Sequence, residues 1–444
     1  MIDRNKMKIL KFGGTSVGSA QRMKEVAKLI CDGNSKIVVL SAMSGTTNSL
    51  VEISNYLYKK NKEGATELIS KLLAKYLGVI DELFSTEAYK QKAIDAINLH
   101  FNHIRSLVKD LFTLFEEKEI LAQGELLSTH MMHFYLLETG IKSALIPALD
   151  YMRTDINAEP DTAYIKEKLH VLLKNNEGAD LYITQGYICR NASGEVDNLE
   201  RGGSDYSASL IGAAIHAEEI QIWTDIDGMH NNDPRVVDKT TPVRQLHFDE
   251  AAELAYFGAK ILHPTCILPA KLNNIPVRLL NTMQPDAPGT TISNETEKEK
   301  IKAIAAKDNI TAIKIKSGRM LLATGFLRKV FEIFELHKTP IDMVTTSEVG
   351  VSVTIDNNRH LDNIVDDLKK YGSVTVDRDM MIVCVVGDLK WENVGFEAKI
   401  IHATKDIPVR MISYGGSNYN VSLLIKAADK KRALQALSDH LFNN

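Results

Sequence analysis

A glycine-rich stretch near the N-terminus carries the first residues whose types and spacing suit chemistry. It reads KFGGTSVG over residues 11–18, and Lys11 stands two residues before Gly13 and Gly14. At a turn from a strand into a helix, backbone N–H groups can point outward to bind an anion, and glycine lets a phosphate approach the backbone closely. The spacing matches neither G-x-x-x-x-G-K-[ST] nor G-x-G-x-x-G. Taken alone, the stretch could also be a tight turn that binds nothing.

Small, hydroxyl and charged residues recur at four further places along the chain. They read SAMSGTTNSL (41–50), NLERGGSDYSASL (198–210), WTDIDGMHNNDPRVV (223–237) and FGAKILHP (257–264). Each has a simpler explanation by itself, since Thr47 and Asp205 could cap helices and a single Glu on a helix, such as Glu125, usually faces solvent. The cations that accompany these loops are Lys11, Arg201, Arg235 and Lys260. Together they indicate phosphoryl transfer, which depends on positioning and charge neutralisation.

Composition favours a small-molecule partner. The 444 residues are 44% hydrophobic and 25% charged, with a net charge of −4 and no long basic block, so no nucleic-acid partner is expected. The four cysteines are scattered, which fits a reducing cytoplasm. No apolar run approaches the ~18 residues of a membrane span. His130 and His133 could share a helix face, but without a third ligand we expect no metal site there.

Alternating strands and helices must position these loops. KMKILKF, KIVVLSAM, SALIP, LYITQGYI and EIQIWTDI read as short buried strands with helical patterns between them, and residues 50–140 are mainly helical. This alternation predicts a mostly parallel sheet covered on both faces, in which ligands bind where strands end. We expect a catalytic domain over residues 1–295 and a charged linker, TEKEK, at 296–300.

An internal repeat follows the linker. TPIDMVTTSEVGVSVTI (339–355) resembles IPVRMISYGGSNYNVSLLI (407–425), and each copy reads strand, helix, strand, strand, helix. A small α+β unit is thus used twice, over 301–376 and 377–444. The second copy lacks one strand, and we expect residues 301–306 to complete it. In the first copy Phe326, Leu327, Val330 and Phe334 fall at helical spacing and are expected in the core.

The motifs together resemble those of the aspartokinases, of the amino-acid kinase fold. KFGGTSV, SAMSGTTN, ERGGSD, WTDIDG…DPR and FGAKILHP occur in that family's order, and the repeat is similar to its tandem ACT domains. The resemblance implies an α/β kinase domain followed by two ferredoxin-like ACT units. It implies transfer of the ATP γ-phosphoryl group to the β-carboxylate of L-aspartate, giving 4-phospho-L-aspartate on the route to lysine, threonine and methionine. Two alternatives are a related kinase with another acceptor and a catalytically silent amino-acid sensor.

The resemblance also implies roles for individual residues. Lys11 and Asp205 are implied to be catalytic, with Asp205 orienting lysines and the magnesium-bearing phosphates rather than acting as a base. The implied aspartate-binding residues are Thr47, Glu125 and Arg201. The implied ATP-binding residues are Gly13, Gly14, Thr224, Asp225, His230, Arg235 and Lys260. The family often has Tyr at the position of His230. Mg²⁺ is expected on ATP oxygens, because no carboxylate cluster for a dedicated metal site is visible.

The ACT pair is implied to sense an amino acid, most closely resembling the lysine-sensitive, single-function type. The implied effector residues are Met320, Phe326, Leu327, Asp342, Ser347 and Glu348. Asp342 could pair with an ammonium group, whereas the second copy has Arg410 at the matching place, so we expect only the first copy to hold the effector. The resemblance further implies a cytoplasmic homodimer or dimer of dimers joined through the ACT units. Alternatively, both units serve only to dimerise.

Overall fold

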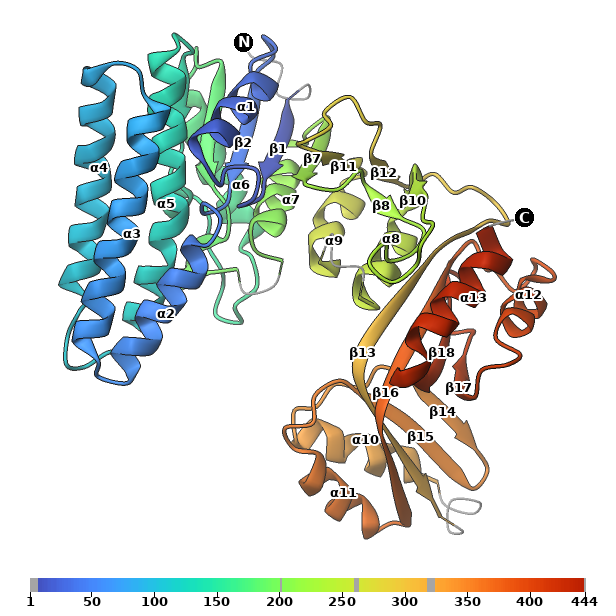
Figure 1. The fold of residues 1–444 in the computed structure, drawn as a ribbon. Coiled ribbons are helices and arrows are strands. Elements are labelled where there is room, and N and C mark those ends of the chain that lie inside the picture. Colours follow the sequence, from blue (N-terminus) through green and yellow to red (C-terminus); the bar gives the residue numbers. More distant parts are fainter. Residues whose placement is uncertain (1–6, 200–201, 259–262, 318–323, 443–444) are drawn as a thin grey trace. The chain divides into compact units, whose positions relative to one another are not determined.

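The computed structural model describes residues 7–199, 202–258, 263–317 and 324–442, which fold into two compact units. Unit 1 comprises Met1–Met229 and Ile261–Asn294, and unit 2 comprises His230–Lys260 and Glu295–Asn444. Figure 1 shows both units, with labels on those elements for which there is room. No helix within the described ranges has the length and apolar character needed to cross a membrane.

A mostly parallel sheet forms the centre of unit 1. Its strands follow the order β12-β11-β7-β1-β2-β4-β3, and neighbours are parallel except β11 and β12. Their bounds are β1 Lys8–Phe12, β2 Lys36–Leu40, β3 Ser143–Leu145, β4 Leu181–Gln185, β7 Glu219–Thr224, β11 Val277–Asn281 and β12 Thr290–Ser293. Every residue of β2 and β4 is buried, as expected for strands covered on both faces. The predicted α/β sheet is therefore confirmed.

Helices cover this sheet and extend beside it. They are α1 Ala20–Ile30, α2 Thr46–Tyr58, α3 Lys62–Leu83, α4 Glu87–Ser106, α5 Leu114–Glu138, α6 Thr162–Asn175, α7 Gly203–Ile215 and α9 Pro264–Leu272. A short antiparallel pair, β5 (Ile188–Arg190) and β6 (Val196–Asn198), follows β4. Figure 1 shows α3, α4 and α5 lying side by side. Their contact is apolar, with Tyr76 and Phe101 fully buried and their ring centroids 5.9 Å apart, and the predicted helical stretch 50–140 shares one apolar core with β1, β2 and β4.

Unit 2 is built on an antiparallel sheet in the order β14-β15-β13-β16-β18-β17. Its elements are β13 Ile301–Lys316, α10 Phe326–Leu336, β14 Val344–Ser347, β15 Gly350–Ile355, α11 Leu361–Lys369, β16 Ser373–Gly387, α12 Phe396–Ala403, β17 Val409–Ser413, β18 Asn420–Lys426 and α13 Lys430–Phe442. Unit 2 also holds β9 (Pro242–Val243), β10 (Gln245–His247) and α8 (Phe248–Tyr256). The order strand, helix, strand, strand, helix therefore occurs twice.

Two long strands run through both copies of the repeat. The first half of β13 pairs from Ile301↔Gly387 to Lys307↔Ile382, and the second half from Ile310↔Met380 to Lys316↔Ser373. The second half also pairs with β15 of the first copy, while the C-terminal half of β16 pairs with β18 of the second copy. Asn309 and Asp379 adopt left-handed backbone conformations where the register shifts. Residues 301–306 thus lie in the sheet beside the second copy.

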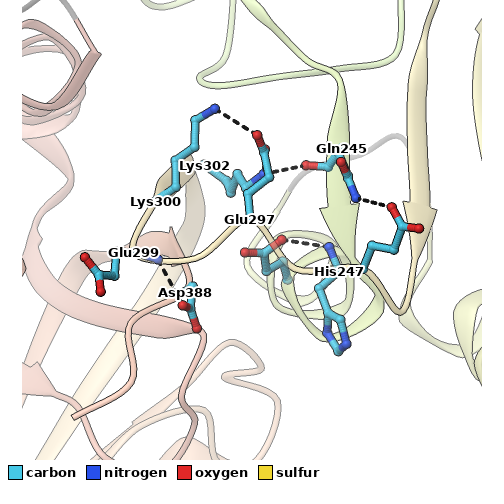
Figure 2. Close-up of polar contacts among 9 residues, drawn as sticks. Gln245, His247, Glu297, Glu299, Lys300, Lys302 and Asp388 are labelled. Carbon is cyan, nitrogen blue, oxygen red and sulfur yellow. Dashed lines mark hydrogen bonds and ion pairs between the residues drawn. The ribbon is translucent and has the colours of Figure 1, made fainter. Parts of the chain in front are cut away.

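Ion pairs and hydrogen bonds fix the charged segment at 296–300, as Figure 2 shows. Lys302, whose side chain is only 2% exposed, donates to the Gln245 carbonyl at 2.9 Å and pairs with Glu297. Lys300 lies 3.2 Å from the same glutamate, and the Glu299 amide donates to Asp388 at 3.0 Å. The segment is therefore anchored from Glu297 to Lys300, chiefly by the buried side chains of Lys302 and Asp388.

Candidate functional site

The loop after β1 is held close to the loop after β2. The Ser44 amide donates to the Gly14 carbonyl at 3.1 Å, and the Ser41 amide donates to the Phe12 carbonyl at 3.2 Å. A Cβ at Gly14 would lie 2.7 Å from the Ala42 carbonyl oxygen, so this approach requires glycine. The motifs KFGGTS and SAMSG therefore form one surface at the carboxyl edge of the sheet.

Lys11 and Asp205 form an ion pair at this edge. The Nζ of Lys11 lies 2.6 Å from Oδ1 of Asp205, and the two side chains are 11% and 16% exposed. Asp205 stands in the first turn of α7, whose N-cap is Gly202 in the left-handed conformation. Asp205 is therefore not the helix cap that its position suggested. The helix N-terminus, with its outward N–H groups, and the lysine ammonium lie together where an anion could bind.

Glu125 is buried inside the same unit, facing the β2 loop. Its Oε1 accepts a hydrogen bond from the Ala42 amide at 3.1 Å, and the residue is 5% exposed. Burial raises the pKa of Glu125 to about 8, and the Ala42 hydrogen bond opposes the rise only in part. Thr47 lies exposed in the first turn of α2, which is capped by Gly45, so it too is not a cap. A buried acid of this kind suits a cationic ligand group.

The end of β7 is tied to the glycine loop through a residue that the motifs did not reveal. The Thr282 amide donates to the Thr224 carbonyl at 2.8 Å, and the Thr282 hydroxyl hydrogen-bonds to the buried Ser16 hydroxyl, also at 2.8 Å. Asp225 follows Thr224 and is exposed. A contact between residues so distant in sequence leaves no periodic signal, although NTM (281–283) directly follows the strand-like VRLL.

Other predicted site residues lie elsewhere or outside the described residues. His230 and Arg235 belong to unit 2, where His230 Nδ1 lies 2.8 Å from the Thr240 hydroxyl and Arg235 binds Asp233 through two nitrogens at 2.9 Å each. Arg201, Lys260 and Met320 fall outside the described ranges. Within those ranges, no group of three or more His, Cys, Asp or Glu could hold a metal ion.

The expected effector residues lie around the first copy of the repeat. Asp342 is bound by Lys307 at 2.6 Å, while Ser347 and Glu348 are exposed at the β14–β15 turn. Phe326, with Val330 and Phe334, is buried as predicted. The prediction for Leu327 was wrong, since it is 39% exposed. It follows Phe326 directly on α10 and so points about 100° away from the buried face.

Unit 1 therefore offers an anion site beside a buried acid. A phosphate could be neutralised by Lys11 and approached by the glycine loop, while a ligand ammonium could pair with Glu125. Preorganised charges of this kind stabilise a phosphoryl group in transfer without covalent chemistry by the protein.

Comparisons with known proteins agree with this geometry. Residues 6–281 match the amino acid kinase family, and residues 383–441 match an ACT domain. The chain is 35% identical to chloroplastic aspartokinase 1 of Arabidopsis thaliana, over 98% of this chain and 80% of that protein. It is 32% identical to lysine-sensitive aspartokinase 3 of Escherichia coli (strain K12), over 98% and 99%. Its structure is similar to E. coli aspartokinase III in complex with aspartate and ADP (R-state), with a TM-score of 0.85, 32% identity and coverage of 98% and 100%.

Proposed function

Because the chain belongs to the aspartokinases within the amino acid kinase family, we propose that it transfers the γ-phosphoryl group of ATP to the β-carboxylate of L-aspartate. The products are ADP and 4-phospho-L-aspartate, on the route to lysine, threonine and methionine. The observation that carries this proposal is the Lys11–Asp205 ion pair beside the glycine loop. In this pair Asp205 fixes the position of the Lys11 ammonium, which is the positive charge offered to the transferring phosphoryl group.

The reaction requires charge neutralisation more than proton transfer. A β-carboxylate has an ordinary pKa of ~3.9 and is already ionised at neutral pH, so it needs no general base. The barrier is the repulsion between this anion and the ATP polyanion. Lys11 and the amides of Gly13 and Gly14 offset it, and Asp205 holds the Lys11 ammonium in place. Asp205 is thus a positioning residue in this scheme.

The acceptor is recognised by residues of opposite charge. Glu125 takes the α-ammonium group of aspartate, Arg201 takes the α-carboxylate, and Thr47 adds a hydroxyl contact. Glu125 is supported by its burial beside the Ala42 amide, because an ammonium ion would compensate a carboxylate that burial disfavours. Thr47 is supported by its exposure at the start of α2.

The nucleotide is proposed to bind Thr224, Asp225, His230, Arg235 and Lys260, with Gly13 and Gly14 at the phosphates. Mg²⁺ enters with the ATP phosphates. The bidentate Asp233–Arg235 contact implies that Arg235 leaves or shares this partner when it meets a phosphate.

L-lysine is the proposed allosteric effector, since the similar E. coli enzyme is named lysine-sensitive. The proposed site comprises Met320, Phe326, Leu327, Asp342, Ser347 and Glu348. The second copy has Arg410 bound to Asp377 at the matching place, a cation that would repel an ammonium group. We place the enzyme in the cytoplasm as a homodimer or dimer of dimers joined through the ACT units, with the catalytic domain ending near residue 295.

A hydroxamate assay tests the reaction. Purified protein with ATP, Mg²⁺ and hydroxylamine should form aspartyl hydroxamate from L-aspartate, because hydroxylamine displaces phosphate from the acyl phosphate product, and Lys11→Met should lower the rate about 10²- to 10³-fold. Lys8→Met is a matched control on the same strand. The Lys8 side chain is 36% exposed and makes one long ion pair, 3.9 Å from Glu218, so its loss should leave the rate unchanged. Product from glutamate alone would identify a related kinase. No product from either acid, with ATP intact, would leave a silent sensor.

A further inference from the structure

An ammonium group lies between two carboxylates and an aromatic ring in unit 2. Lys307, on β13, places its Nζ 2.6 Å from Oδ1 of Asp342 and 3.0 Å from Oδ2 of Asp356. The same atom lies 4.6 Å from the centroid of the Tyr256 ring, and the Tyr256 hydroxyl donates to Asp342 at 3.2 Å. Carboxylates around a ring face are the chemistry that recognises a primary ammonium ion.

Asp342 is the most deeply buried member of this group. Its side chain is 2% exposed, against 18% for Lys307 and 40% for Asp356. Its Oδ2 is buried and has no hydrogen-bond partner among the described residues. Burial raises the pKa of Asp342, and the Lys307 ammonium opposes that rise. The carboxylate therefore needs a cation and keeps one acceptor unused.

We propose that Tyr256, Asp342 and Asp356 form an ammonium-binding site, that Lys307 occupies it in the effector-free protein, and that a free amino acid enters only by displacing the Lys307 ammonium. This rests on the proposed regulation by lysine, and it adds two binding residues and an internal competitor to that site. The ligand class is an amino acid or amine with a primary ammonium group.

The internal ammonium can leave because its stem is long and its side chain reaches solvent. Its departure breaks at least one charge-assisted hydrogen bond of ordinary net strength. The free ligand must compete with this contact, so Lys307 lowers the apparent affinity about tenfold or more. A variant without the Lys307 ammonium should therefore bind the free ligand about tenfold or more tightly.

Displacement also reaches α8. Tyr256 is the last residue of that helix and shares the Asp342 oxygen with Lys307. A ligand ammonium that takes the place of Lys307 on this oxygen becomes the new neighbour of the Tyr256 hydroxyl. Tyr256 stands directly before the FGAK motif in the sequence, so occupation of the site changes a contact at the start of that motif.

The test measures L-lysine binding by isothermal titration calorimetry on the full chain. Lys307→Met should bind L-lysine about tenfold or more tightly than the wild type. Lys430→Met is the matched control, because its ammonium lies 2.6 Å from Asp308 rather than from Asp342. Its affinity for L-lysine should equal that of the wild type.

Equal or weaker binding by Lys307→Met overturns the proposal. If that variant does not fold, Lys307→Gln replaces it with the same expected direction, and thermal melting shows which variant is folded. Tighter L-lysine binding by Lys430→Met would also overturn the proposal, because loss of a lysine away from Asp342 would then raise the affinity as well. Failure here leaves aspartate-dependent hydroxamate formation intact, so it is distinct from failure of the proposed function.

Discussion

Replacing Glu125 by glutamine should make the protein more stable and less active. The side chain is buried, and burial raises the pKa of Glu125 to about 8 from its ordinary value of 4.5. The folded state therefore keeps a proton that the unfolded chain releases, and wild-type stability falls as pH rises from about 4.5 to 8. Glutamine stays neutral and can still accept the Ala42 hydrogen bond, so the variant escapes this loss.

The size of the effect follows from the interval between the two pKa values. Each pKa unit corresponds to about 1.4 kcal/mol, so the free energy of unfolding of Glu125→Gln should gain about 4 kcal/mol relative to wild type between pH 4.5 and pH 8. For a unit of more than 200 residues this is a rise in melting temperature of about 8 °C at pH 8. KM for aspartate should rise about 10- to 100-fold, because the ammonium partner is lost.

Thermal melting of both proteins from pH 5 to pH 8.5, without ligands, measures this difference. Glu116→Gln on the same helix is a control of opposite sign. The hydrogen bond from the Thr113 side chain lowers the pKa of Glu116, so this variant should lose stability at neutral pH and match wild type in acid. A difference between Glu125→Gln and wild type that stays constant with pH would refute the reasoning.

Substitutions at three further positions test the role of Lys11 and the packing of unit 1. Lys11→Met should lower kcat while leaving KM for aspartate within about threefold, as steady-state rates will show, because Lys11 faces the transferring phosphoryl group rather than the acceptor. Thr282→Val leaves the buried Ser16 hydroxyl unpaired and should cost about 1–3 kcal/mol in urea unfolding, while Thr282→Ser restores most of it. Gly186→Ala would place a Cβ 2.8 Å from the Ser204 Cα, so calorimetry should show a loss of about 1–3 kcal/mol; a melting temperature equal to wild type would contradict that contact.

The sequence predicted those parts of the fold that depend on local periodicity and glycine spacing. Buried runs such as KIVVL became β2, and the lysine before the GGTS loop pairs with Asp205 of the GGSD segment (202–205). The GGTS motif could be recognised in the sequence because its fold requires glycine at position 14, where a Cβ would clash with the Ala42 carbonyl oxygen. A steric requirement of this kind fixes the residue type at one position, so it is visible in the sequence alone.

Long-range side-chain partners could not be predicted in the same way. Ser16 with Thr282, and Lys307 with Asp342, are joined only by the tertiary fold, and neither pair has a period or spacing. For Thr47 and Asp205, the structure excludes the alternative that their side chains cap helices. The N-cap residue is instead a glycine in the left-handed conformation, Gly45 for α2 and Gly202 for α7. Neither helix has a side-chain cap hydrogen bond at this position.

The strands that the two copies of the repeat share make the copies depend on one another for stability. Each copy borrows half of a strand from the other, through β13 and β16, so neither copy has a complete sheet by itself. Loss or exchange of one copy would remove the central β13–β16 pairing on which the other copy depends, and both should therefore open in a single cooperative step. If a protease cleaved the β14–β15 turn, the two fragments would remain associated through the β13–β16 strand pairing.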